Sequence, residues 1–237
     1  MHDDFYESYE VTKALQTSAF VIFMRDVYLW MTFAFITTGL TAAYVASSPT
    51  LTQIFSGNIT CWILALFEVC IVWYLSSRIT LLSFPTASIL YVLFSILNGL
   101  TLNSIFLEYT MESIETTFYI TAGTFGAMTL VGYFTKNDLS TKRSFLIMAF
   151  IGLIIATIVN IFLQSTQMMW LITYAGILIF CGFTIYDTQK IKTMFLVMDG
   201  DKSETKLKAA LIVSLALYLD FINLLYYLLR IFKGRRT

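Results

Sequence analysis

The chain has 237 residues, of which 58% are hydrophobic and only 13% are charged. The charged share is about half of that in soluble globular domains, and the mean hydropathy of +0.76 is correspondingly high. These values exclude a water-soluble fold. Fifteen basic residues balance fifteen acidic ones, so the chain lacks the basic excess with which proteins neutralise nucleic-acid phosphates. We therefore expect a lipid bilayer, and no nucleic acid, as the partner.

Residue types that build common catalytic sites are scarce. The single histidine is His2, so no serine–histidine pair, histidine zinc site or haem-ligating histidine can lie within the membrane. Cys61, Cys70 and Cys181 lie in apolar runs without CxxC spacing, and we interpret them as small buried hydrophobic residues. We expect neither enzymatic activity nor a bound cofactor.

Seven apolar segments follow a polar N-terminal segment. Residues 1–26 lack the short apolar core after a basic start that marks a cleaved signal peptide, so we expect a retained tail. An α-helix rises about 1.5 Å per residue and needs about 20 apolar residues to cross a bilayer. The predicted spans are 27–46, 60–77, 86–107, 116–134, 144–163, 168–186 and 209–232.

These segments predict an all-α integral membrane protein. They are continuously apolar, whereas barrel strands alternate polar and apolar residues over about ten positions. The membrane domain is expected over 27–232, and a basic C-terminal tail over 233–237. Gly123 with Ala127, and Gly152 with Ala156, have the small-xxx-small spacing that allows close helix packing.

The distribution of Lys and Arg predicts a cytoplasmic N-terminus. Eleven of these residues fall on the side of the N-terminal tail, and the three loops on the other side contain none. Seven spans would place Arg230 and the basic tail outside, whereas the same rule would prefer six spans or a last segment that turns back. We favour seven, because 209–232 is long enough to cross.

An ionisable side chain deep in a bilayer costs several kcal/mol and therefore points to function. Asp220 lies in the middle of the last span, too far from either end to reach water. Asn223 and Tyr227 follow on the same helical face, so we expect one polar stripe that faces the bundle. The alternative is a permanently protonated Asp220 that hydrogen-bonds a neighbouring helix for packing.

Three further ionisable residues lie in or beside the apolar segments. Glu68 is embedded in the second span without an evident polar partner. Asp187 ends the sixth span, where it would serve equally well as a helix cap or as a partner of Lys190. Arg78 closes the second span, where a guanidinium group commonly reaches the lipid headgroups.

Asp187 and Asp220 would form a proton-sensing site if they faced each other. Two carboxylates a few ångströms apart in a low dielectric cannot both be ionised, so they would share one proton. Without that proton they offer up to four oxygen ligands, which Ca²⁺ prefers. Protons and Ca²⁺ would then compete for one site, and a nearby arginine that favours the charged form would complete a two-state switch.

Four segments resemble the Bax-inhibitor-type family, especially its bacterial members. They are GLTLNSIFLEYT (99–110), ITAGTFGAMTLVGYFTKNDLS (120–140), FCGFTIYDTQKIK (180–192) and LYLDFINLLYYLLRIF (217–232). The resemblance implies a seven-helix bundle with the C-terminal helix at its centre, and a pH-sensitive calcium leak channel. It places the family's paired aspartates at Asp187 and Asp220. It places the family's latch arginine at Arg78; in the alternative assignment, Glu68 is the residue that lies beside the latch.

The resemblance also bears on location and partners. It implies a bacterial plasma membrane, or the endoplasmic reticulum in a eukaryote, with calcium and protons as the transported or bound species. Some bacterial relatives bind a membrane-anchored ATP-dependent protease, so a non-conducting adaptor or stress regulator is the alternative function.

An intramembrane aspartyl protease is a minor alternative. Such an enzyme also uses two aspartates that share a proton. Asp220, however, follows LYL rather than a GxG turn, and the only prolines are Pro49 and Pro85, so the proline motif expected downstream is missing.

Overall fold

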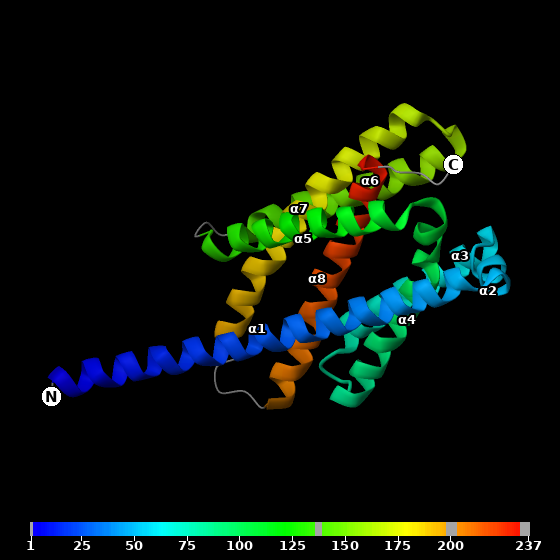
Figure 1. Cartoon of the computed structure of the whole chain (residues 1–237). Coiled ribbons are helices and arrows are strands. Elements are labelled where there is room, and N and C mark those ends of the chain that lie inside the picture. The colour runs from blue at the N-terminus through cyan, green and yellow to red at the C-terminus, as the bar shows by residue number, and fades with distance from the viewer. Residues whose placement is uncertain (1, 136–138, 198–202, 233–237) are drawn as a thin grey trace.

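The computed structural model describes residues 2–135, 139–197 and 203–232, which form helices and no β-strand (Figure 1). In chain order the elements are α1 (His2–Ser47), α2 (Pro49–Phe55), α3 (Asn58–Arg78), α4 (Phe84–Glu108), α5 (Met111–Phe134), the 3₁₀ turn η1 (Ser140–Lys142), α6 (Arg143–Leu163), α7 (Thr166–Val197) and α8 (Ser203–Ile231). The all-α class predicted from the sequence is confirmed.

Local sequence signals set several helix ends. The Ser83 hydroxyl accepts a hydrogen bond from the Thr86 N–H at the start of α4, where Pro85 occupies the first turn. The Thr110 hydroxyl caps α5 in the same way through the Ser113 N–H. Gln164 ends α6 in the left-handed conformation, with φ of 49°.

Six of the described helices are long and apolar enough to cross a membrane. These candidate spans are Ser18–Ser47, Ile59–Arg78, Phe84–Glu108, Arg143–Leu163, Thr166–Lys192 and Glu204–Ile231. The predicted span 116–134 corresponds to α5, which has 24 residues but is not among them. Threonines such as Thr117, Thr121 and Thr124 lower the hydropathy of α5, so the seventh span is not established by length and composition.

The helices extend beyond the predicted spans, most clearly α1, α7 and α8. The helix α1 begins at His2 and therefore includes the described part of the predicted tail 1–26, while α7 continues to Val197 and α8 already begins at Ser203. Asp187 consequently lies inside α7 and is not a cap at its end. The predicted basic tail, residues 233–237, lies outside the described residues.

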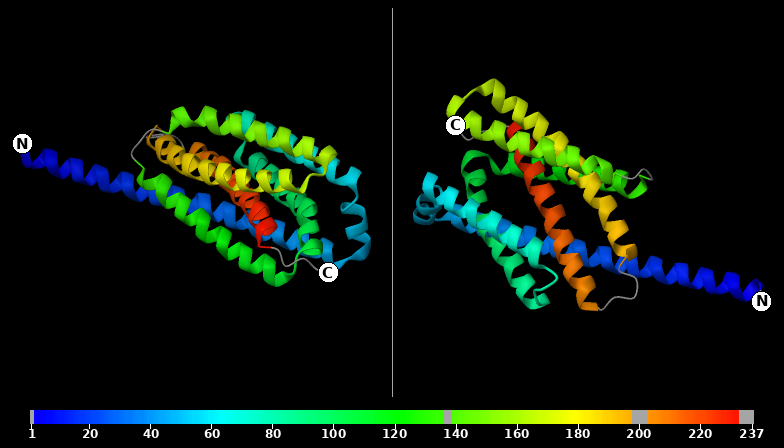
Figure 2. Two further views of the ribbon diagram at one scale, coloured as in Figure 1. Left: turned by 90° about the horizontal axis from the view of Figure 1, so that it is seen from above. Right: turned by 180° about the vertical axis from the view of Figure 1, so that it is seen from behind.

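The helix α8 is the most buried of the candidate spans. In α8, 61% of the most apolar stretch is buried, against 6% in α6 and 11% in α3. It contacts α7 and α5 on one side and α1 and α4 on the other (Figures 1 and 2). Large side chains such as Trp62, Trp73 and Phe162 are exposed on α3 and α6, as expected where a helix faces lipid rather than water.

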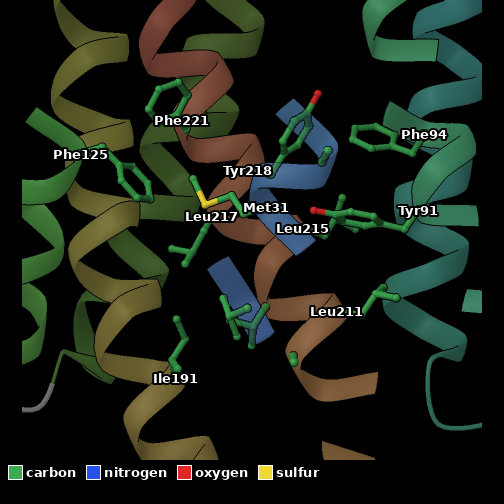
Figure 3. Packing of buried hydrophobic residues seen from close by; sticks show 14 of the residues in the cluster. Met31, Tyr91, Phe94, Phe125, Ile191, Leu211, Leu215, Leu217, Tyr218 and Phe221 are labelled. Atoms are coloured by element: carbon green, nitrogen blue, oxygen red, sulfur yellow. The ribbon is translucent and has the colours of Figure 1, made fainter. Parts of the chain in front are cut away.

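Aromatic and aliphatic side chains of α8 fill the core. Phe221 packs against Phe35 of α1, Phe118 and Phe125 of α5, with ring centroids 4.5, 5.5 and 5.6 Å away. Leu211, Leu215, Leu217 and Tyr218 are also buried along α8 (Figure 3). The core therefore joins α8 to helices on several of its sides.

The close helix contacts are made by glycines other than those predicted. A Cβ at Gly123 or Gly152 would meet nothing within 4 Å, so the predicted contacts there are wrong. A Cβ at Gly99 would lie 2.7 Å from the Thr38 carbonyl of α1, and one at Gly176 would lie 2.6 Å from the Tyr227 ring of α8. Spacing alone does not tell which face of a helix is packed.

The expectation that all three cysteines are buried is also wrong. Cys61 and Cys181 are half-buried and Cys70 is exposed on α3. An exposed thiol on a lipid-facing surface behaves as a small apolar group, so the residue type remains consistent with a membrane span.

Candidate functional site

The contact between α7 and α8 sets the level of the two aspartates. The Phe180 ring of α7 stacks on the Tyr227 ring of α8, with centroids 6.0 Å apart. Asp187 lies about two turns beyond Phe180, and Asp220 lies about two turns before Tyr227. The helices α7 and α8 run in opposite directions (Figure 1), and residues two turns apart share a helical face. Asp187 and Asp220 therefore lie at about the same level on facing surfaces.

Asp220 is the most deeply buried carboxyl group at this contact. It is 5% exposed, and its Oδ2 has no hydrogen-bond partner among the residues that the structure describes. The neighbouring charge that acts on Asp220 is the carboxylate of Asp187. The two aspartates predicted as a site are thus brought into electrostatic contact at a place that water does not reach freely.

A cavity of about 430 Å³ opens beside Asp187. Its walls come from α3, α7, α8 and the first residue of α6. Three charged residues line it, namely Asp187, Lys190 and Arg143, and the two cations act electrostatically on the Asp187 carboxylate. The other lining residues are mostly apolar. Asp187 therefore lies between the buried Asp220 and this cavity, where Lys190 and Arg143 place positive charge.

Arg78 does not reach this cavity with its side chain. It is exposed at the end of α3, and it is not among the described residues that line the cavity, although Ser76 and Ile79 on either side of it are. The arginine that lines the cavity is Arg143, which the sequence analysis counted only among the basic residues expected on the side of the N-terminus. The sequence carried no signal for this contact.

Glu68 has polar partners that were not predicted. Its carboxylate accepts hydrogen bonds from the Thr101 hydroxyl at 2.6 Å and the Asn98 amide at 3.3 Å, both from α4. The Asn98 side-chain oxygen in turn accepts a hydrogen bond from the Tyr218 hydroxyl at 2.9 Å. The same hydroxyl lies 2.7 Å from the Thr38 hydroxyl of α1. These contacts form one polar network across α3, α4, α8 and α1.

The helix α8 thus carries polar side chains on two faces, and the prediction of a single stripe is wrong. Residues two apart on a helix point in nearly opposite directions, so Tyr218 faces α4 and α1 while Asp220 faces α7. Figure 3 shows Tyr218 beside Phe94 of α4. Asn223, predicted to support the aspartates, donates to the Leu219 carbonyl of its own helix at 2.8 Å.

A multidentate metal site does not appear at the described positions. No group of three or more His, Cys, Asp or Glu side chains gathers within 2–135, 139–197 and 203–232. The carboxyl groups of Asp187 and Asp220 are the oxygen ligands that this contact offers to a cation.

The fold and the site define a class: a multi-helix integral membrane protein whose most buried helix carries a carboxyl group opposite a second one. The family described as inhibitor of apoptosis-promoting Bax1 matches residues 21–237. The chain belongs to this Bax inhibitor family.

Relatives along nearly the whole chain are bacterial. The inner membrane protein YbhL of Escherichia coli K12 is 44% identical over 215 residues, which cover 90% of this chain and 92% of that protein. A protein of Borreliella burgdorferi is 40% identical over 91% of this chain and 93% of its own length. One from Rickettsia prowazekii is 36% identical over 90% of each chain.

Proposed function

We propose that this protein is a calcium leak channel of the bacterial inner membrane, and that the Asp187–Asp220 pair controls conduction by binding or releasing a proton. In this proposal the chain crosses the membrane seven times, including α5, and α8 lies at the centre with the N-terminus in the cytoplasm. Membership of the Bax inhibitor family and the similarity to an inner membrane protein support the setting.

The observation that carries the proposal is the unpartnered Oδ2 of Asp220 beside Asp187. A buried carboxylate with one unpartnered oxygen, next to a second carboxylate, is unfavourable as a doubly ionised pair. One shared proton relieves the repulsion. A divalent cation relieves it equally well, so protons and Ca²⁺ compete for the pair.

The Asp187–Asp220 pair is better suited to a permeating Ca²⁺ ion than to a tightly bound one. Ca²⁺ takes about 6–8 oxygen ligands, and two carboxylates supply at most about four, so water would complete the shell. Such a site binds weakly enough for the ion to leave. The cavity beside Asp187, which Asp187, Lys190 and Arg143 line among mostly apolar residues, is the space from which ion and water would enter.

The proposed role of Arg78 as a latch requires its side chain to move. Arg78 lies at the rim of the cavity through its neighbours Ser76 and Ile79, but its side chain is exposed. To act as a latch, its guanidinium must turn toward Asp187. Arg143 and Lys190, which already act on Asp187, would favour the ionised pair before that movement.

A flux assay tests the proposal. The purified protein is reconstituted in liposomes with a trapped calcium dye, and flux is followed between about pH 5 and pH 8. We expect a pH-dependent calcium flux in the parent and an altered pH profile in Asp187→Asn and Asp220→Asn. Glu112→Gln, which removes an exposed acid at the start of α5, should retain the parent profile.

Other outcomes would favour the alternative functions. An absence of flux under all these conditions would contradict the channel and favour a non-conducting adaptor, for example of a membrane-anchored ATP-dependent protease. An adaptor also predicts that Asp220→Asn leaves the biological effect intact. Cleavage of a co-reconstituted transmembrane helix would instead favour an aspartyl protease.

A further inference from the structure

Gln189 binds both ends of the connection between α5 and α6 with one side chain. Its Oε1 accepts a hydrogen bond from the Leu139 N–H at 2.9 Å. Its Nε2 donates to the carbonyl of Thr135, the residue that ends α5, at 3.3 Å. Gln189 itself lies on α7, two residues after Asp187. One amide group therefore attaches this connection to the helix that carries the site.

The chain that follows Leu139 leads directly to the cavity. Leu139 accepts a hydrogen bond at its carbonyl from the Lys142 N–H, 2.9 Å away, which closes the turn η1. Arg143 is the next residue and begins α6. Because this turn is short and hydrogen-bonded, the position of Leu139 determines where the Arg143 side chain starts.

Close packing brings α5 to α7 at the same level. A Cβ at Gly132 would lie 2.9 Å from the Thr188 Cβ and 3.1 Å from the Ile185 Cα. Only glycine allows α5 to come this near to α7. The carbonyl of Thr135, about one turn later, is thereby brought within reach of the Gln189 amide.

We propose that Gln189 is a positioning residue that holds the α5–α6 connection against α7 and so keeps the Arg143 guanidinium at the cavity beside Asp187. The charges that act on Asp187 are Lys190 on its own helix and Arg143 on α6, with Asp220 opposite on α8. Replacing Gln189 therefore changes the position of the Arg143 charge. The consequence for flux rests on the proposed function, whereas the consequence for structure does not.

Hydrogen–deuterium exchange in lipid nanodiscs tests the attachment. In Gln189→Ala the Leu139 N–H loses its acceptor, and exchange of a peptide that contains it should become about tenfold faster. Gln189→Glu keeps an acceptor oxygen for Leu139 and should exchange nearly as slowly as the parent. Gln167→Ala, at an exposed glutamine near the other end of α7, is the matched control. Equal exchange in Gln189→Ala and Gln167→Ala would overturn the proposal.

Disulfide formation tests the position of residue 143. Cys61, Cys70 and Cys181 are replaced by alanine, Arg143→Cys and Asp187→Cys are introduced together, and unreacted thiols are counted by maleimide labelling after mild oxidation. Adding Gln189→Ala should slow disulfide formation severalfold, and adding Gln167→Ala should leave it unchanged. An unchanged rate with Gln189→Ala would contradict the positioning role even if exchange became faster.

The flux assay separates this proposal from the channel function. Gln189→Ala should shift the pH profile of flux in the same direction as Arg143→Gln, which a general loss of stability would not do. If the parent shows no flux, the channel function fails, and the exchange and disulfide experiments still decide the role of Gln189. If the parent conducts and the two variants shift in opposite directions, the positioning role is wrong.

Discussion

Tyr218 is the residue through which α8 is joined to the polar network of α1, α3 and α4. Its hydroxyl contacts both Thr38 and the Asn98 amide group, and its ring is fully buried. Hydrogen bonds between membrane helices contribute about 0.6 kcal/mol on average and at most about 1.7 kcal/mol. The network therefore contributes modestly to the free energy of unfolding. Its hydrogen bonds define how α8 is positioned against α1 and α4.

Tyr218→Phe tests the contribution of this network. The substitution keeps the ring and removes the hydroxyl, so we expect the free energy of unfolding to fall by about 1–2 kcal/mol. The measurement is unfolding in mild detergent at increasing denaturant concentration. Tyr119→Phe removes a hydroxyl from a tyrosine that is 65% exposed and should have little effect. Equal effects of the two substitutions would show that the network contributes nothing specific.

At the scale of single residues, the sequence could predict only those that are unusual where they stand. Asp220 is conspicuous because an acid in an apolar run is costly. Arg143 and Gln189 are not, because each lies among other polar residues near a helix end and makes its contact with a distant segment of the chain. The partners of Glu68 were missed for the same reason, although Asn98 lies in an apolar span.

Glycines set the distance between pairs of helices. At Gly132 the backbones of α5 and α7 come so close that a Cβ would collide with Ile185 and Thr188. At Gly152 of α6 no atom lies within 4 Å of the same position. Gly132 therefore allows close packing of two helices and Gly152 does not, although each is a glycine within a long helix.

Alanine substitutions should separate these two cases. Gly132→Ala forces α5 and α7 apart, and we expect a loss of about 1–3 kcal/mol in the free energy of unfolding. Gly152→Ala meets no neighbour and should be neutral or stabilising by up to about 1 kcal/mol, because alanine favours the helix. Thermal unfolding in detergent compares both with the parent. A stable Gly132→Ala would show that these helices are not in close contact.

Hydropathy predicts where a helix can cross lipid, but not where it ends. The segments 187–197 and 203–208 carry charges and were excluded from the predicted spans, yet they belong to α7 and α8. Polar residues are compatible with a helix, so α7 and α8 continue beyond their most apolar stretches. This continuation is what brings Asp187 and Asp220 to one level, which the predicted spans left undecided.

At the scale of the whole molecule, composition alone predicted the class. A chain with so few charges and such long apolar runs has no other fold available than helices in a membrane. The number of spans was not fixed in this way, because α5 combines sufficient length with many threonines. The high burial of α8 also depends on contacts with helices that are distant in the sequence, such as α1 and α4.

Thiol labelling from either side of the membrane tests whether α5 crosses. In a chain without its native cysteines, Glu112→Cys and Thr141→Cys place single exposed thiols near the two ends of α5. With seven spans, an impermeant maleimide should label residue 112 from outside in intact cells and residue 141 only after the membrane is opened. Labelling of both from the same side would contradict seven spans and favour six.

Infrared difference spectroscopy of the protein in lipid nanodiscs tests most directly whether Asp187 and Asp220 hold one proton between them. Stepping the pH between about 5 and 8 should remove a carboxylic-acid C=O band from the parent, and Ca²⁺ at constant pH should remove the same band. The account predicts that the pH dependence of this band changes in both Asp187→Asn and Asp220→Asn. An unchanged band in both Asp187→Asn and Asp220→Asn, or a parent without any titrating carboxyl band, would contradict it.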